Sequence, residues 1–360
     1  MLNYKMKVIA VHLLNNYSGS PKVLMQLLKG WTKNDIETHL YTCGGEGFLS
    51  DIPKVNSHFY WYSFSKNRIV RLLFLLTSQV FLAVKLSFNL KKKDVLYINT
   101  VLPFGAAIIG KIIGCKVIYH IHETSIKPAI FKKFLFVIVQ WCASEVVYVS
   151  NFLAKQEPIK TKKSILYNVL ESDFREKACL HLNTVKETKI ILMICSLKVY
   201  KGVNQFVKLA ETNPKLTFKL IVNASQKDIV NYFKNETLPT NLIIYPTQID
   251  THRFYQEASI LLNLSDTKLW VETFGLTILE AMAYGLPTIV PPVGGIVELI
   301  ENKKNGYLID SKELNLISEK INELFENPSV YHQMSQCAIT KSTFFSEDYF
   351  ENESIRILSN

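Results

Sequence analysis

The segment VETFGLTILEAMAYGLP, residues 271–287, contains a short helix signal with a carboxylate on either side of its start. The apolar run at 277–284 predicts a helix. Gly285 and then Pro287 mark the end of this helix. Three residues precede this helix, and their backbone N–H groups would have no helical acceptor: Phe274, Gly275 and Leu276. N–H groups in this position lie at the positive end of the helix dipole and favour a phosphate.

Two glutamates accompany these N–H groups. Glu280 is one turn inside the predicted helix among apolar neighbours, where a carboxylate needs a hydrogen-bond donor from a ribose or from the protein. Glu272 precedes the helix, close enough to accept hydroxyls from a sugar attached to the phosphate. The pattern predicts a nucleotide-sugar site. The alternative is that Glu280 only neutralises the helix end and that Glu272 is solvated.

Working outward, short β-branched runs alternate with helical patterns in both halves of the chain. Strands are expected at 7–14, 37–43, 94–100, 116–122, 145–150 and 164–170, then at 189–197, 218–224, 241–247, 260–265 and 287–291. Helices are expected at 21–31, 104–113, 129–142, 151–156, 203–211 and 277–284. This alternation predicts an α/β fold of two Rossmann-like domains in series, with a ligand cleft between them.

The domain boundaries follow from the same alternation of strands and helices. The first domain is expected at 1–170 and the second at 171–340, beginning with a polar linker at 171–189. A helix at 341–360 is expected to pack back toward the first domain.

Loops at the ends of two strands carry candidate anion contacts. In the first domain, Gly19 lies between a strand and a helix, where it forms either an anion-binding loop or a plain tight turn. In the second domain, Ser196, Lys198 and Lys201 follow a buried strand. The two lysines would face the cleft and a phosphate; solvated loop lysines are the alternative.

Composition limits the class of protein. The chain has 360 residues, 48% of them hydrophobic and 20% charged, which suits two domains of a soluble protein. Its six cysteines are scattered, so we expect neither disulfides nor a zinc site, and a reducing compartment. The start lacks a small-residue cleavage site, so we expect no secretory signal.

Charge is divided unevenly between the halves. Residues 1–180 carry 24 Lys and Arg against 11 Asp and Glu, a net charge of +13, whereas residues 181–360 carry 17 against 20. An anionic partner for the first domain is therefore expected, either a membrane surface or a phosphorylated substrate. Nucleic acid is not expected, because no nucleic-acid motif is present.

A known family shows the same motifs. The segment ETFGLTILEAMAYGLPTIVPPVGGIVELIENKKNGYLI, residues 272–309, resembles the nucleotide-binding signature of family 4 glycosyltransferases of the GT-B fold. That signature has two glutamates separated by seven residues, then AMAxGxP, GGxxE and NGxL. Further pieces follow in the family's order: SGSPKVL, YHIHE, VSNF, LYNV and SLKVYKGV. The resemblance implies two Rossmann-like domains, the first binding the acceptor and the second the nucleotide sugar.

The resemblance also implies roles for residues. Lys201 would hold the donor pyrophosphate, Glu280 the ribose, and Glu272 with the N–H groups of Phe274, Gly275 and Leu276 the transferred sugar. Gly19, Ser196 and Lys198 would complete the donor site. His122 would approach the sugar from the first domain, with Lys201 and Glu272 as its catalytic partners. His120 competes with His122 for this role, but Glu123 follows His122 as in the family.

One departure concerns the diphosphate. The family has Gly-Arg where this chain has Cys195-Ser196, and Lys198 is the candidate replacement for the missing cation. No DxD pair follows a strand, so we expect neither a metal nor another cofactor. The expected activity is retaining transfer of a UDP- or GDP-linked sugar to a hydroxyl of a glycan or lipid-linked glycan, in cytoplasmic assembly of surface polysaccharide. A GT-B nucleotide-sugar epimerase and a catalytically silent subunit that binds a partner transferase are the alternatives.

A long apolar segment bears on the acceptor. Residues 68–93 are nearly all apolar, but Arg71 and Lys85 are too close together to leave a bilayer span between them. Arg71, Ser78 and Lys85 recur every seven residues and predict a narrow polar stripe on a helix. With FKKF at 131–134, this helix could rest on an anionic membrane as a peripheral contact. A core helix with its polar stripe exposed is the alternative.

Overall fold

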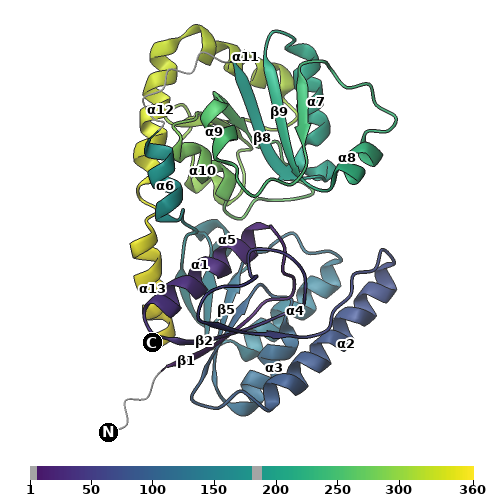
Figure 1. Ribbon diagram of the computed structural model, residues 1–360, viewed down its shortest axis with the longest axis vertical. Helices are drawn as coiled ribbons and strands as arrows, with labels where there is room; N and C mark the ends of the chain where they lie inside the picture. The colour runs from purple at the N-terminus through teal and green to yellow at the C-terminus, as the bar shows by residue number, and fades with distance from the viewer. Residues whose placement is uncertain (1–5, 181–188) are drawn as a thin grey trace. The chain divides into compact units, whose positions relative to one another are not determined.

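The computed structural model describes residues 6–180 and 189–360 (Figure 1). The chain divides into two compact units. The first consists of Met1–Tyr167 together with Asp348–Asn360, and the second of Asn168–Glu347. Each unit contains one parallel sheet with its own helices.

The sheet of the first unit has seven parallel strands in the order β3-β2-β1-β4-β5-β6-β7. The strands are β1 Lys7–Val11, β2 Glu37–Thr42, β3 Val55–Phe59, β4 Val95–Asn99, β5 Lys116–Ile121, β6 Glu145–Tyr148 and β7 Lys162–Ile165. The central strands β4 and β6 are buried along their whole length, because helices cover both faces of a doubly wound sheet. In β1, Val8 is paired with both Thr38 and Val95, which fixes the register at the centre of the sheet.

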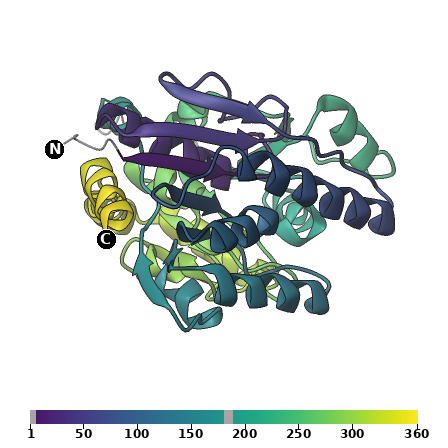
Figure 2. The ribbon, with the colours of Figure 1, turned by 90° about the horizontal axis from the view of Figure 1, so that it is seen from below.

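Six helices accompany this sheet: α1 Gly19–Lys33, α2 Arg68–Ser87, α3 Phe104–Ile113, α4 Ala129–Cys142, α5 Asn151–Gln156 and α13 Glu347–Ser359. Helix α3 packs against both α2 and α4, so the three lie side by side (Figures 1 and 2, blue shades). The contact between α2 and α3 is close, since a Cβ added to Gly105 would lie 2.3 Å from the backbone oxygen of Gln79.

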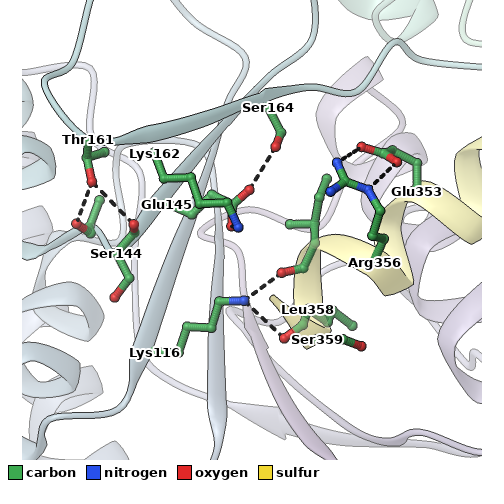
Figure 3. A network of polar contacts seen from close by, with 12 residues as sticks. Lys116, Ser144, Glu145, Thr161, Lys162, Ser164, Glu353, Arg356, Leu358 and Ser359 are labelled. Atoms are coloured by element: carbon green, nitrogen blue, oxygen red, sulfur yellow. Dashed lines mark hydrogen bonds and ion pairs between the residues drawn. The ribbon is translucent and has the colours of Figure 1, made fainter.

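Helix α13 packs on the first unit although it ends the chain (Figure 2, yellow). Trp31 Nε1 on α1 donates to Ser354 Oγ at 3.0 Å. At the carboxyl end of α13, Lys116 Nζ donates to the backbone oxygens of Ile357 and Leu358 at 2.6 and 3.0 Å (Figure 3). A lysine at this point satisfies the last carbonyl groups of the helix and complements its dipole. These contacts therefore hold the middle and the carboxyl end of α13 in the first unit.

The second unit has a six-stranded parallel sheet in the order β10-β9-β8-β11-β12-β13. The strands are β8 Ile190–Ser196, β9 Thr217–Asn223, β10 Leu242–Tyr245, β11 Ile260–Leu262, β12 Thr288–Val290 and β13 Gly306–Leu308. The helices are α6 Ser172–Cys179, α7 Val203–Thr212, α8 Gln226–Tyr232, α9 His252–Glu257, α10 Leu276–Ala283, α11 Leu314–Glu326 and α12 Pro328–Ser342, with short 3₁₀ turns η1 Val199–Lys201 and η2 Gly295–Glu298. Phe206, Phe218 and Ile289 are fully buried in its core.

Several expected elements differ from those observed. Strands β3 and β13 were not expected, because edge strands need no continuous apolar run: β3 reads VNSHF and is largely exposed. Strand β7 is KKSI rather than the apolar SILYNVL, for the same reason. The expected polar linker begins with helix α6, and its residues 181–188 lie outside the described part of the chain.

The alternative of a core helix with its polar stripe exposed is wrong for α2. Ser78 is fully buried, and Lys85 Nζ donates to the backbone oxygen of Phe59 at 2.6 Å. The guanidinium of Arg71 lies 5.5 Å from the ring of Phe64. The stripe thus turns toward the protein, and the apolar side of α2 faces outward.

Candidate functional site

Glycines fix the chain that leads into α10. Gly275, the residue before this helix, has φ +103°, a conformation that side chains rarely adopt. Gly295 N–H donates to the backbone oxygen of Glu272 at 2.7 Å, and a Cβ on Gly295 would lie 1.9 Å from the oxygen of Thr273. The glycine pair of the GGxxE motif therefore holds the backbone that carries Glu272.

Helix α10 begins at Leu276, one residue before the expected start. The N–H groups of Ile278 and Leu279 donate back to Gly275 at 3.1 and 3.2 Å, so the N–H groups of Leu276 and Thr277 come first at the helix end. The side chain of Phe274 is buried and packs edge to face on Phe345. Phe274 is thus a core anchor that sets the position of the helix end.

Lys201 and Glu272 form an ion pair at this helix end. Lys201 Nζ donates to Glu272 Oε1 at 2.5 Å, and both side chains are largely buried. Glu272 Oε1 also accepts from Ser265 Oγ at 2.9 Å, and Asn263 Nδ2 lies 3.5 Å away. The ring of Trp270 lies 4.8 Å from Lys201 Nζ, which favours the cation further. Residues from η1, the loop after β11 and the approach to α10 thus meet at one point.

The charge state of this pair follows from two opposed effects. Burial raises the pKa of Glu272, but the charge and hydrogen bond of Lys201, with Ser265 and Asn263, outweigh it and leave the pKa below its usual value. Glu272 is therefore ionised at neutral pH. The half-buried Cys195 lies nearby, and desolvation raises the pKa of its thiol to about 12, so it is a neutral neighbour rather than a nucleophile.

Glu280 has a protein donor. It is buried on α10, and its Oε2 accepts from Tyr255 Oη at 2.6 Å. The ring of Tyr255 stacks on that of Tyr284, with 5.7 Å between centroids. Burial, with the charge of Glu280, holds the pKa of Tyr255 well above its usual value, so the tyrosine stays a donor. Of the two donors considered for Glu280, the structure shows the protein one.

The loop after β8 brings the predicted lysines to the same end of the sheet. Ser196 ends the strand, and its backbone oxygen accepts from the N–H of Lys198 at 2.7 Å. Lys198 is exposed, whereas Lys201 is drawn inward by the turn η1. Gly202, with φ +80°, allows this turn, since a Cβ there would lie 2.2 Å from the oxygen of Leu264.

The other predicted residues belong to the first unit. His122 is half-buried, and its Nε2 donates to Asn99 Oδ1 at 2.8 Å. Asn99 Nδ2 in turn donates to the backbone oxygen of Ser20, next to Gly19. Gly19 is exposed and is the first residue of α1. Asn99 therefore links the end of β4, the histidine after β5 and the start of α1.

The two competing histidines differ in their surroundings. His120 is fully buried, and its Nδ1 lies 2.9 Å from Tyr97 Oη. Burial lowers the pKa of His120 to about 3, and burial with the nearby histidines holds that of His122 well below its usual value. Burial raises the pKa of Glu123 to about 7. Both imidazoles are thus neutral at pH 7, and His122 is the more accessible one.

Sequence reasoning singled out some of these residues and missed others. The structure joins Lys201 and Glu272 directly, and places Ser196, Lys198, Gly275 and Leu276 on the neighbouring turns. The missed partners are Asn99, Tyr255, Asn263, Ser265 and Trp270. Asn263 and Ser265 could have been found, because polar residues after a buried strand lie at the end of the sheet where ligands bind.

Metal ligands are not grouped at this site. Among residues 6–180 and 189–360, no three His, Cys, Asp or Glu side chains are arranged to hold a metal ion.

Comparison with known proteins gives a family match over part of the chain and a similar fold over nearly all of it. The family described as "Glycosyl transferases group 1" matches residues 176–341. An "Uncharacterized glycosyltransferase" of Haemophilus influenzae is 30% identical over 169 residues, 45% of this chain and 46% of that protein. An "Uncharacterized 41.2 kDa protein in cps region" of Klebsiella pneumoniae is 24% identical over 271 residues, 67% of this chain and 72% of that protein. The chain thus spans less than half the length of the first relative.

Among solved structures, Anabaena Alr3699/HepE in complex with UDP-glucose superimposes with a TM-score of 0.81 at 17% identity, covering 98% of this chain and 99% of that one. At this identity the likeness concerns the fold alone, and it extends over both units.

Proposed function

We propose that the protein is a retaining glycosyltransferase that uses a nucleoside diphosphate sugar. The match of residues 176–341 to the family described as glycosyl transferases group 1, on a chain with the expected GT-B fold, supports this proposal. The observation that carries the proposal is the buried ion pair of Lys201 and Glu272 beside the amino end of α10. It provides a cation and N–H groups for a diphosphate, next to a carboxylate for sugar hydroxyls.

Lys201 and the α10 N–H groups stabilise the leaving group. As the bond between the sugar C1 and the phosphate oxygen breaks, the nucleoside diphosphate departs with the electron pair and its negative charge grows. Lys201 leaves Glu272 for a phosphate oxygen, and the first N–H groups of α10 donate to another. Lys198, exposed at the start of the same turn, is the candidate for a second cation. This positive charge supports transfer without a metal.

The remaining groups position donor and acceptor. Glu272, released from Lys201, accepts hydroxyls of the transferred sugar, and Glu280 accepts those of the ribose while keeping Tyr255 as its protein partner. The acceptor oxygen forms the new bond to C1 on the face that the diphosphate leaves, and its proton passes to the departing phosphate oxygen. His122, oriented by Asn99, is the proposed catalytic histidine of the first unit.

A UDP-linked sugar is the proposed donor, supported by the UDP-glucose bound to the Anabaena structure. The proposed acceptor is a hydroxyl of a glycan or lipid-linked glycan in cytoplasmic assembly of surface polysaccharide. The description of the Klebsiella relative supports this role.

The test is calorimetric binding of UDP to the wild type and to Lys201→Ala, with UDP release measured on a panel of UDP-sugars and acceptors. We expect Lys201→Ala to weaken UDP binding and to lower turnover by about 100-fold. Lys208→Ala, an exposed lysine on α7, is the matched control and should change neither. Unchanged binding and turnover in Lys201→Ala would contradict the proposal. Release of an epimerised donor without acceptor would identify an epimerase instead.

A further inference from the structure

The outer side of α2 is an exposed apolar stripe. Its residues recur at helical spacing and share one face: Ile69, Leu73, Leu76, Val80 and Val84. Ile69 is 72% exposed and Val80 is 63% exposed. A run of large apolar side chains in this state is typical of a surface that meets lipid or another protein.

The inner side of α2 is tied to the protein. Gln79 Oε1 accepts from the N–H of Gly105 on α3 at 3.1 Å, and Ser78 is fully buried beside it. The helix has 20 residues, and its most apolar 18-residue stretch has a mean hydropathy of 1.9, so it is long and apolar enough to cross a membrane. Its buried polar residues and its close contact with α3 hold it in the first unit instead. Helix α2 is therefore suited to lie on a membrane and not to span it.

Helix α4 presents a second stripe of the same kind. Four exposed side chains fall on one face: Ile130, Phe134, Val137 and Trp141. Ile130 is 78% exposed and Val137 is 58% exposed. Helix α3 lies between α2 and α4 and adds the exposed Ile112 (Figure 1). We call the outer faces of α2, α3 and α4 the apolar helix face.

The positive charge around the apolar helix face indicates which kind of partner this face binds. Residues 52–144, which include all three helices, contain 13 Lys and Arg but only two acidic residues, Asp94 and Glu123. Asp94 is buried, whereas Lys91, Lys92 and Lys93 are exposed just after α2. Two copies of the chain meeting through this face would bring like charges together, which opposes self-association. An anionic bilayer satisfies both the apolar side chains and the lysines.

We propose that the apolar helix face docks the protein on an anionic lipid bilayer. The α2 and α4 stripes enter the boundary between headgroups and acyl chains, and Trp61 and Trp141, both exposed, lie at the level of the headgroups. Lys91, Lys92 and Lys93 contact the anionic headgroups. The surface is built within the first unit alone, so it holds whether or not the proposed donor site is correct.

The test is sedimentation of the full chain with vesicles of phosphatidylcholine, alone or with about one third phosphatidylglycerol. We expect binding to the anionic vesicles, reduced by salt because charge attraction is screened beyond about 8 Å at physiological ionic strength. Leu73→Gln with Val80→Gln should weaken binding about tenfold or more, since both side chains lose their transfer into the acyl region. Lys91→Gln, Lys92→Gln and Lys93→Gln together should weaken it by about fivefold per lysine at low salt.

Matched controls come from the second unit. Val230→Gln with Ile249→Gln removes two equally exposed apolar side chains, and Lys208→Gln, Lys227→Gln and Lys234→Gln remove three exposed lysines. We expect both controls to bind vesicles as the wild type does, and all variants to bind UDP alike. Absence of vesicle binding by the wild type, or equal losses in variants and controls, would overturn the proposal. A dimer in sedimentation velocity that Leu73→Gln with Val80→Gln dissociates would assign the face to a second copy instead.

Discussion

At the scale of single residues, the site is built from charged groups that already have partners. Lys201 holds Glu272, and Tyr255 holds Glu280. The sequence singled out Glu280 because a carboxylate in an apolar helix needs a donor, and Lys201 because it follows a buried strand. It could not predict Tyr255, which lies on α9 and reaches Glu280 only through the folded second unit. No short sequence motif identifies partners of this kind, because the fold brings together residues that are far apart along the chain.

Substitutions can distinguish the role of Glu280 in binding the ribose from the structural role of Tyr255. If Glu280 binds the ribose, Glu280→Gln should weaken UDP binding about 10- to 100-fold, because a hydrogen bond to a charged group contributes about 1.5–3 kcal/mol. Tyr255→Phe, which keeps the ring stack, should lower the melting temperature while UDP affinity stays close to wild type. Calorimetry with UDP and thermal melting measure the two effects. A Glu280→Gln variant that binds UDP normally and only melts lower would show that the carboxylate has a structural role alone.

At the scale of elements, buried segments were predicted well and edge segments poorly. The helices expected at 104–113, 129–142 and 151–156 begin and end as the sequence indicated, because apolar residues at helical spacing are followed by a clear stop such as Gly114. Strands β3 and β7 were missed or shifted, since an edge strand is held by hydrogen bonds to one neighbour and tolerates polar residues. The sequence also did not reveal that the polar stripe of α2 faces the protein, because residue spacing does not say which side of a helix packs on the sheet.

The glycine pair before η2 gives a test at this scale. Gly295→Ala should displace the backbone of Glu272 and Thr273, since the new Cβ would lie 1.9 Å from a backbone oxygen that cannot move aside cheaply. We expect weaker UDP binding and a lower melting temperature. The matched control is Gly44→Ala, where an added Cβ meets no atom within 4 Å. Should Gly295→Ala bind UDP and melt like the control, the glycine pair does not set the position of Glu272.

At the scale of the whole molecule, the polypeptide enters the second unit after Tyr167 and returns to the first at Asp348. The sequence predicted two α/β domains in series from the alternation of strands and helices, since that rhythm reflects a doubly wound sheet. The contacts of α13 depend on single pairs such as Trp31 with Ser354, 323 positions apart, which no local pattern reveals.

Deletion of residues 348–360 tests the place of this last helix. The first unit should lose stability, because Trp31 loses its hydrogen-bond partner and the apolar side of α1 loses its cover, whereas the second unit keeps its contacts. Hydrogen exchange followed by mass spectrometry should therefore show faster exchange in α1 and β5 and unchanged exchange in β8 and β9. A milder variant, Lys116→Met, removes only the cap on α13 and should have a smaller effect in the same unit. Faster exchange spread equally over both units would contradict this assignment.

The return of the chain to its first unit sets an order of events during synthesis. Residues of the second unit are complete when translation reaches Glu347, but the first unit still lacks the helix that covers Trp31. Domains generally fold as units as the nascent chain emerges from the ribosome. The part of this protein that is made first is therefore the part that is finished last.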